Sequence, residues 1–306
     1  MEEMRVLISG ATGFVGRALC RHLLGKGDEV WAFSRRPARA LASLEAGSRV
    51  FAWDAATVEP PTEAFEDVDA VIHLAGEPVA GRWTQAKREA IRASRVDSTQ
   101  LLVAAMAKLE NPPKTLISAS AIGYYGEKGD AEVSEESGPD NDFLAQTAVA
   151  WEAAALRAEL SGVRVVCLRT GIILGQGGGA LEAMLLPFKL GVGGPLGSGK
   201  QWWSWVAFDD VIGLIDFALR TPEVAGPLNV TAPNPVRQKD FAKALGKALN
   251  RPTFLPAPAF ALKLALGGFS AELLSSKKVL PRKAERLGYR FRFNDLDDCL
   301  QHIIGR

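Results

Sequence analysis

A group of glycines near the N-terminus has the spacing of a phosphate-binding loop. In GATGFVG, residues 10–16, glycines follow the apolar run RVLIS and open a segment with helical periodicity. Such glycines permit a sharp turn, leave room for a pyrophosphate and let the helix pack against the strand. The phosphates would lie at the helix N-terminus, where free N–H groups favour anions. The loop predicts a dinucleotide site whose contacts include Gly10, Thr12, Gly13, Phe14, Val15 and Gly16.

The residues after the second apolar run indicate which dinucleotide to expect. The run EVWAFS ends in Ser34, Arg35 and Arg36, where proteins that bind NAD usually carry an acidic residue for the ribose 2′-hydroxyl. An arginine there would pair with a 2′-phosphate and stack on adenine. NADP(H) is therefore expected in preference to NAD(H), although solvated surface arginines are the alternative. Asp54, after the third run, is expected either to accept a hydrogen bond from the adenine amine or to form a turn.

Apolar runs alternate with helical segments along the first 175 residues, which is typical of a parallel sheet covered on both faces. Strands are expected at residues 5–10, 29–34, 49–54, 70–76, 115–120 and 163–171, and helices at 14–26, 83–109 and 147–160. The expected fold class is α/β, a Rossmann-type doubly wound parallel sheet with a smaller C-terminal α/β lobe.

The composition changes after residue 175, where glycine-rich stretches begin. GQGGG at 175–179 and LGVGGPLGSGK at 190–200 are typical of loops that line binding sites. We expect residues 1–175 to form the dinucleotide-binding domain, with its sheet completed by parts of 205–232. Residues 176–306 would form a smaller lobe on the substrate side and a helical C-terminal region.

Several longer motifs point to a known group of proteins. They are GATGFVG, HLAGEPVAGRWT, SASAIGYYG, LRTGIILG, GSGKQWWSWVAFDD and LPRKAERLGYRFRF, and they extend over essentially the whole chain. Together they resemble the extended short-chain dehydrogenase/epimerase superfamily, and within it the "epimerase family" of NAD(P)-binding proteins with a C-terminal domain of unknown function.

The resemblance implies further cofactor contacts. The cofactor's ribose would lie along Leu74, Ala75 and Gly76, and the nicotinamide ribose beside Ser118, Ala119 and Ser120. Residues from Arg169 to Ile172 would edge the nicotinamide pocket. For Arg169 an internal ion pair is an equally supported alternative.

The acid/base pair that is usual in the superfamily is missing. A tyrosine and a lysine spaced as YxxxK share one helix face, and the lysine lowers the tyrosine pKa so that the phenol can transfer a proton. In residues 140–152 the two places hold Leu144 and Ala148. The candidate replacements near the nicotinamide are Ser120, Tyr124, Tyr125 and Glu77, with Lys87 more remote. For the two tyrosines, packing beneath the loop is an equally supported role.

The composition excludes several classes of protein. A net charge of +1 provides no global field for nucleic acid or an anionic membrane. The three cysteines and three histidines are scattered, so neither a disulfide framework nor a metal site is expected. The start lacks the features of a signal peptide, and the longest apolar stretch is too short to span a bilayer. We expect a cytoplasmic protein, with homo-oligomerisation left open.

Two functions are consistent with these patterns. The first is an NADP(H)-dependent oxidoreductase or epimerase with unusual acid/base groups, acting on an unknown small molecule for which a nucleotide sugar is one candidate. The second is a catalytically silent NADP(H)-binding sensor or regulator. Glycine-rich loops and a second lobe favour the first function, whereas the missing YxxxK pair favours the second.

Overall fold

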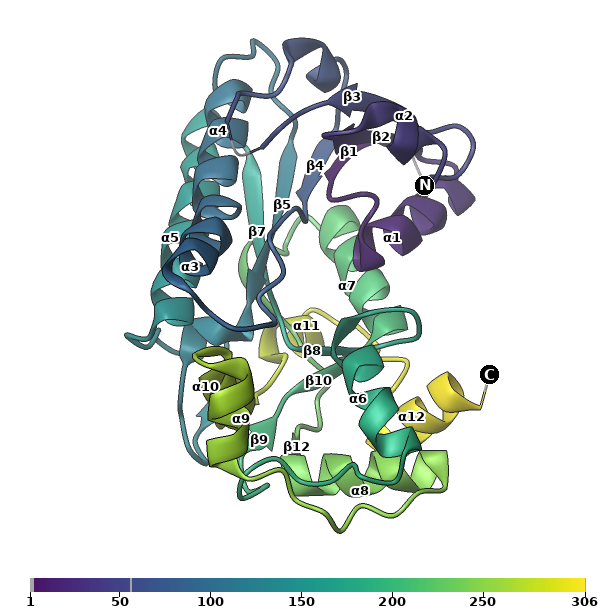
Figure 1. The fold of residues 1–306 in the computed structure, drawn as a ribbon. Helices are drawn as coiled ribbons and strands as arrows, with labels where there is room; N and C mark the ends of the chain where they lie inside the picture. Colours follow the sequence, from purple (N-terminus) through teal and green to yellow (C-terminus); the bar gives the residue numbers. More distant parts are fainter. Residues whose placement is uncertain (1–2, 56, 306) are drawn as a thin grey trace.

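A parallel sheet of seven strands lies at the centre of the computed structural model, which describes residues 3–55 and 57–305 (Figure 1). The strands follow the order β11 (Gly226–Val230), β7 (Arg164–Thr170), β5 (Thr115–Ala121), β4 (Ala70–His73), β1 (Arg5–Ser9), β2 (Glu29–Ser34) and β3 (Arg49–Ala52). Every neighbouring pair is parallel. The direction of winding reverses between β1 and β4, and ligands of such sheets bind at the carboxyl ends of strands at this switch point.

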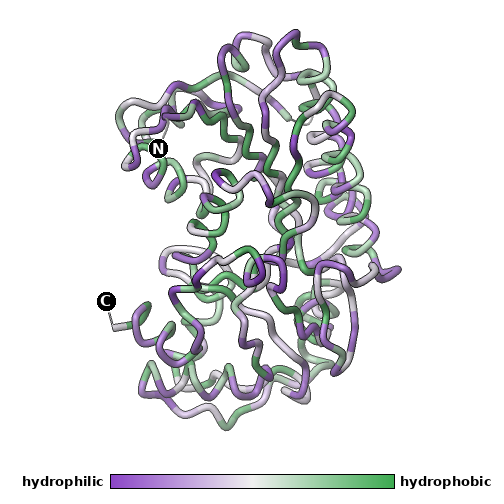
Figure 2. Tube along the Cα trace, turned by 180° about the vertical axis from the view of Figure 1, so that it is seen from behind, coloured by the Kyte–Doolittle hydropathy of each residue, from purple (hydrophilic) through white to green (hydrophobic). Residues whose placement is uncertain are grey.

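Helices cover both faces of the sheet, which confirms the doubly wound α/β class. One face packs against α1 (Phe14–Gly25) and α7 (Phe208–Arg220), and the other against α4 (Val96–Met106) and α5 (Phe143–Leu156). Successive residues of a strand point to opposite faces, so both faces of these strands are apolar. The central strands accordingly form the most continuous hydrophobic stretches of the trace (Figure 2).

The prediction of a single helix at residues 83–109 is wrong, because two helices occupy this region. They are α3 (Gln85–Ala93) and α4, separated at Ser94 and Arg95. The Ser94 hydroxyl donates to the Ile91 carbonyl oxygen and accepts the Glu77 N–H. A serine that bonds nearby backbone groups competes with regular helix geometry. The interruption places Arg95 on the wall of the cavity described below.

The helix expected at 147–160 begins and ends earlier than predicted. It is α5, whose N-terminus is capped by the Asp142 carboxylate, which accepts the Ala145 N–H at 2.9 Å. Asp is a favoured capping residue because it satisfies an otherwise unpaired backbone donor. A 3₁₀ turn, η3 (Arg157–Ser161), follows the helix.

The polypeptide after β7 builds a second core below the sheet and also returns to it. In this second core α6 (Gly179–Lys189), α8 (Gln238–Leu249) and α12 (Leu296–Ile304) surround Trp203, Trp205 and Phe241. The remaining elements are short: α2 (Pro37–Leu41), η1 (Thr62–Phe65), η2 (Ile122–Tyr125), β6 (Glu132–Val133), β8 (Ile172–Leu174), β9 (Trp202–Trp203), β10 (Trp205–Ala207), β12 (Val236–Arg237), α9 (Ala259–Leu266), α10 (Phe269–Leu274), β13 (Lys278–Val279) and α11 (Arg282–Arg286). No helix in the described ranges is both long and apolar enough to cross a membrane.

Candidate functional site

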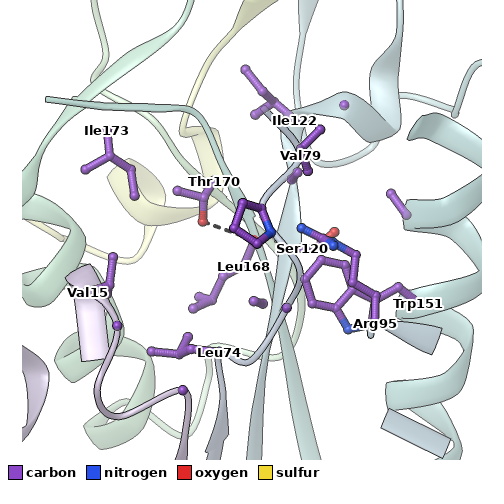
Figure 3. A pocket seen from close by; sticks show the side chains of 18 of the residues that line it. Val15, Leu74, Val79, Arg95, Ser120, Ile122, Trp151, Leu168, Thr170 and Ile173 are labelled. Carbon is purple, nitrogen blue, oxygen red and sulfur yellow. Dashed lines mark hydrogen bonds between the residues drawn. The ribbon is translucent and has the colours of Figure 1, made fainter. Parts of the chain in front are cut away.

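A cavity of about 580 Å³ lies at the carboxyl edge of the sheet, at the switch point between β1 and β4 (Figure 3). Its wall combines the loop after β1, the segment after β4, the end of β5, one face of α5 and the end of β7. Helices α7 and α10 complete it. Of the residues expected at the site, the cavity is lined by Gly10, Gly13, Phe14, Val15, Gly16, Leu74, Ala75, Gly76, Glu77, Ala119, Ser120 and Ile172.

The glycine loop fits a bound pyrophosphate. Gly10 has φ +74°, and a Cβ there would lie 2.9 Å from the Ala75 nitrogen. A Cβ on Gly16 would lie 2.2 Å from the Gly10 carbonyl oxygen, so this glycine permits α1 to touch the loop. The N-terminus of α1 has no side-chain cap and no acidic residue in its first turn. Its N–H groups and dipole are therefore suited to an anion.

A buried histidine holds the segment after β4 against this loop. The His73 Nδ1 lies 2.5 Å from the Ser9 hydroxyl, which accepts the Ala75 N–H, and the His73 Nε2 lies 3.1 Å from the Ser98 hydroxyl. Because the Ser98 hydroxyl donates to the Ser94 carbonyl oxygen, we assign the ring proton to Nε2. Burial lowers the His73 pKa to about 4, which agrees with a neutral ring in these contacts.

The residues expected around the adenosine lie beside the cavity and outside its lining. Ser34 ends β2, next to β1, so the exposed Arg35 and Arg36 stand on the same edge of the sheet as Gly10. Neither arginine side chain has an ion-pair partner within residues 3–55 and 57–305. Asp54 lies beyond the end of β3, where its carbonyl oxygen accepts the Thr57 N–H in a turn. Thr12 is exposed and also lies outside the lining.

Ser120 connects the cavity to a buried ion pair. Its hydroxyl donates to Glu152 Oε1 at 2.6 Å. Arg169 binds the same carboxylate through both oxygens, with Nε and Nη2 each 2.8 Å from their acceptors. Arg169 is buried and does not line the cavity. It forms the internal ion pair that was the alternative to a place at the edge of the nicotinamide pocket. Ser120 is thus held between the cavity and the Glu152 carboxylate.

The two tyrosines and Ser118 lie beneath the cavity and do not line it. The Tyr125 hydroxyl is fully buried, donates to Asn229 Oδ1 at 2.7 Å and accepts from Arg169. Burial raises the Tyr125 pKa to about 12. The Arg169 guanidinium packs on the Tyr124 ring, with the guanidinium carbon 3.5 Å from the ring centroid. Ser118 is also buried. Both tyrosines therefore pack beneath the cavity, which is the alternative to a catalytic role that the sequence allowed.

The helix face that would carry the YxxxK pair does border the cavity, and the two positions of the pair are apolar. Leu144 and Ala148 both line the cavity, as do Thr147 and Trp151. Glu77 lines it too, with its carboxylate 2.6 Å from Lys87 Nζ. The polar and charged side chains on the wall are those of Glu77, Arg95, Ser120, Thr147, Thr170 and Glu272.

Several residues at the site were missed from the sequence. Glu152 follows Leu144 and Ala148 at a spacing of four on α5, so the three residues share one helix face. This spacing could have pointed to Glu152 as a residue of the site. The cavity itself is lined by Arg95, at the interruption between α3 and α4, and by Phe269 and Glu272 of α10. No local pattern identified these three, because the contacts of Ser94 and Arg95 with Glu77 and the return of α10 to the sheet edge belong to the tertiary fold. Among the described residues no His, Cys, Asp or Glu cluster is suited to a metal ion.

Comparison with known proteins gives a consistent result over the whole chain. The model of the NAD dependent epimerase/dehydratase family matches residues 6–231, and a domain of unknown function, DUF1731, matches residues 257–303. The epimerase family protein YfhF of Bacillus subtilis is 37% identical over 99% of this chain and 98% of its own. The epimerase family protein SDR39U1 of Bos taurus is 39% identical over 99% of this chain and 100% of its own.

Among solved structures, the human epimerase family protein SDR39U1, crystallised with NADPH, is similar with a TM-score of 0.88. It is 37% identical, and the alignment covers 99% of this chain and 100% of that chain. The glycine loop, the switch-point cavity and these matches lead to one assignment: the chain belongs to the NAD dependent epimerase/dehydratase family.

Proposed function

We propose that the cavity binds NADP(H) in preference to NAD(H). The observation that carries the proposal is the position of Arg35 and Arg36, two exposed arginines beside the uncapped, glycine-rich N-terminus of α1. The loop provides N–H groups for the pyrophosphate, and the arginines provide a charged fork for a 2′-phosphate. The human relative that was crystallised with NADPH supports the same choice.

Calorimetric titration with NADPH and NADH tests this proposal. Replacing both Arg35 and Arg36 by alanine should weaken NADPH binding by about 1–3 kcal/mol and leave NADH binding nearly unchanged, because only NADPH has the 2′-phosphate. Arg39→Ala is the matched control, since Arg39 is another exposed arginine in the same segment. Equal affinities of the unmodified protein for the two cofactors would contradict the proposal.

We further propose that the protein is an oxidoreductase or epimerase in which Ser120 and Glu152 replace the missing tyrosine and lysine. A bound nicotinamide would accept or supply the hydride. In the oxidative direction Ser120 Oγ would accept the proton of the substrate hydroxyl while its own proton passes to Glu152 Oε1, 2.6 Å away. Arg169 binds both oxygens of Glu152 and so fixes the carboxylate beside Ser120. Reduction would use the same path in reverse.

The division of labour along the chain follows from this assignment. Residues 1–175 would hold the cofactor, and residues 176–306 would provide the substrate side. Phe269 and Glu272 of α10 support this division, because they line the same cavity as Gly13 and Ser120. A nucleotide sugar remains one candidate substrate.

A second candidate function, an NADP(H)-binding sensor without turnover, is favoured by Leu144 and Ala148 on the cavity wall. The two candidates differ in a direct assay. Purified protein would be mixed with NADPH or NADP⁺ and a panel of carbonyl compounds, alcohols and nucleotide sugars, while nicotinamide absorbance and product formation are followed. Turnover with any member supports the enzyme. Tight NADPH binding with no turnover across the panel supports the sensor.

A further inference from the structure

The charged side chains on the cavity wall are unevenly compensated. Glu77 is paired with Lys87 at 2.6 Å, and Glu272 is paired with Lys277 at 3.0 Å. In the part of the chain that the structure describes, no carboxylate lies within ion-pair distance of Arg95, the remaining charged residue of the wall. The Glu77 carboxylate favours the charged form of Arg95 from a distance, but the charge of Glu77 is already neutralised by Lys87. When Lys87 and Lys277 are counted with the carboxylates that they pair, one positive charge at the wall, that of Arg95, is left without a partner among the described residues.

Arg95 has hydrogen-bond partners on one side of its guanidinium only. Its Nη1 donates to the Glu77 carbonyl oxygen at 3.0 Å and the Ile91 carbonyl oxygen at 3.1 Å, with Ser94 Oγ at 3.4 Å. No partner among the described residues contacts Nε or Nη2. These two nitrogens form the edge that binds a carboxylate through two parallel hydrogen bonds. The guanidinium carbon lies over the Trp151 ring, 5.2 Å from the ring centroid, and both side chains border the cavity (Figure 3).

Burial of the Arg95 guanidinium costs free energy unless a ligand provides hydrogen-bond acceptors for Nε and Nη2. Burial of a charge without a partner is unfavourable, and here burial lowers the pKa of the Arg95 guanidinium to about 10. Arg95 still carries its charge at neutral pH. Its Nη1 is fixed by the backbone carbonyl oxygens of Glu77 and Ile91, which precede the Ser94–Arg95 interruption. A charged donor edge is thus fixed at the cavity wall.

We propose that Arg95 binds a carboxylate of the substrate, so that the substrate class is a hydroxy acid or oxo acid, including uronic acids. The inference rests on the proposed function, because the bound acid would share the cavity with NADP(H) and place its alcohol or carbonyl near Ser120. The single positive charge of Arg95 matches a monoanion. The free Nε and Nη2 edge matches the planar oxygens of a carboxylate.

Ligand-observed NMR titrations of the NADPH-loaded protein test this inference. The probes are 2-hydroxy acids and uronic acids, each paired with its neutral amide, together with inorganic phosphate. We expect at least one acid to bind and its amide to bind about tenfold or more weakly, because hydrogen bonds to charged groups are stronger. Arg95→Gln should weaken the acid to the level of the amide. Arg92→Gln is the matched control, since Arg92 is an exposed arginine in the same region that pairs with Asp97.

The outcomes separate this inference from the proposed cofactor site. NADPH affinity is measured first by calorimetry, and absence of NADPH binding contradicts the cofactor proposal itself. With NADPH bound, equal binding of acids and amides, acid binding that persists in Arg95→Gln, or phosphate binding tighter than any acid would each overturn the role of Arg95. If Arg95→Gln does not fold, the acid-against-amide comparison in the unmodified protein still decides. Arg95→Lys, which keeps the charge and loses the fork, should show intermediate affinity.

Discussion

Glu152 accepts hydrogen bonds from Ser120 and Arg169 at the same time, and this double role can be separated by mutation. Ser120→Ala removes the hydroxyl at the cavity and leaves the buried ion pair intact. We expect it to lower any turnover by about 10²–10⁴-fold, the usual contribution of acid/base catalysis, with NADPH affinity nearly unchanged. Steady-state kinetics and calorimetry on the same preparation measure the two effects.

Two further variants serve as controls for this prediction. Ser120→Thr retains a hydroxyl and should retain most of the activity. Glu152→Gln should lower turnover and also the free energy of unfolding, by about 3–5 kcal/mol, because it leaves the Arg169 charge buried without its partner. Full activity in Ser120→Ala would remove Ser120 from the mechanism and leave Glu77 as the next polar group to test.

His73 makes stability depend on pH in a defined window. Its folded-state pKa is lowered to about 4, whereas an exposed histidine has a pKa of about 6.5. Between these values the unfolded chain binds a proton that the folded chain does not. The contribution of His73 is therefore fully present above about pH 6.5 and falls by about 1.4 kcal/mol per pH unit as the pH decreases toward 4.

Chemical denaturation at several pH values between 7 and 5 measures this dependence. The unmodified protein should lose about 2 kcal/mol between pH 6.5 and 5 through His73 alone. His73→Asn should be less stable at neutral pH and should show a correspondingly smaller loss. The same slope in both proteins would show that other groups control the acid sensitivity.

At the scale of elements, the strand–loop–helix unit at the N-terminus contains glycines with different physical roles. A Cβ on Gly16 would meet backbone atoms of Gly10 and Ala11, at 2.2 Å and 2.8 Å. A Cβ on Gly13 would meet only the Gly10 carbonyl oxygen, at 3.1 Å, and Gly13 lines the cavity. One glycine is required for packing, and the other leaves space for a ligand.

The matched variants Gly13→Val and Gly16→Val should therefore fail in different ways. Gly13→Val should remain folded and lose NADPH binding, because its side chain would occupy the space of the pyrophosphate. Gly16→Val should be destabilised by about 1–3 kcal/mol or more, since α1 must move away from the loop. Thermal melting and NADPH titration distinguish the two. Near-normal NADPH affinity in Gly13→Val would show that the loop is not the phosphate site.

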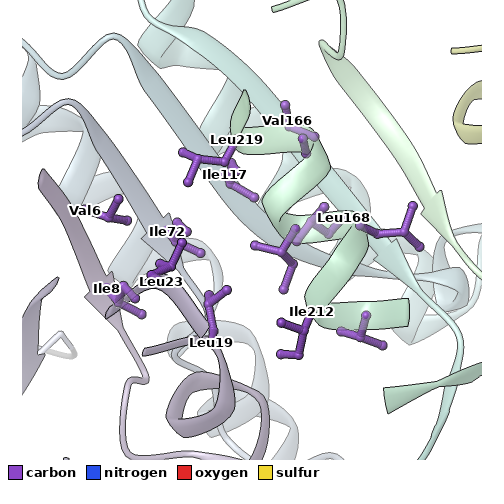
Figure 4. Packing of buried hydrophobic residues seen from close by; sticks show 14 of the residues in the cluster. Val6, Ile8, Leu19, Leu23, Ile72, Ile117, Val166, Leu168, Ile212 and Leu219 are labelled. Atoms are coloured by element: carbon purple, nitrogen blue, oxygen red, sulfur yellow. The ribbon is translucent and has the colours of Figure 1, made fainter. Parts of the chain in front are cut away.

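At the scale of the whole molecule, the sheet depends on residues far beyond the N-terminal domain. Ile212 and Leu219 of α7 pack with residues of α1, β5 and β7, including Leu19, Ile117 and Val166 (Figure 4). Strand β11 pairs with β7 along its length. The C-terminal segment also returns to α7, where the Asp210 carboxylate accepts the backbone N–H groups of Arg292 and Phe293.

A fragment ending at residue 175 should therefore not fold on its own. It would lack β11 and α7 and expose the apolar face of the sheet that they cover, which removes a large part of the hydrophobic stabilisation. Circular dichroism during thermal unfolding should show no cooperative transition for the fragment and a cooperative one for the full chain. A fragment that melts cooperatively and binds NADPH would establish residues 1–175 as an independent domain.

Much of the fold was accessible from the sequence because the relevant signals are local. The glycine loop is a continuous heptapeptide, and the strands of the sheet are uninterrupted apolar runs because they are buried on both faces. Both patterns are properties of neighbouring residues, so they determined the doubly wound class and the expected cofactor loop. The division of residues 83–109 into α3 and α4 escaped, because it depends on a hydrogen bond from Glu77, 17 residues before Ser94.

The chemistry of the cavity was decided by tertiary structure. Ser120 and Glu152 are 32 residues apart in the chain, yet the fold brings their oxygens to 2.6 Å. The unpartnered edge of Arg95 lies at the cavity wall because the interruption after α3 turns this residue to the cavity and the carbonyl of Glu77 binds its other side. Helix α10 reaches the cavity because the C-terminal segment returns to the sheet edge. These contacts join distant parts of the chain, so no spacing in the sequence encodes them.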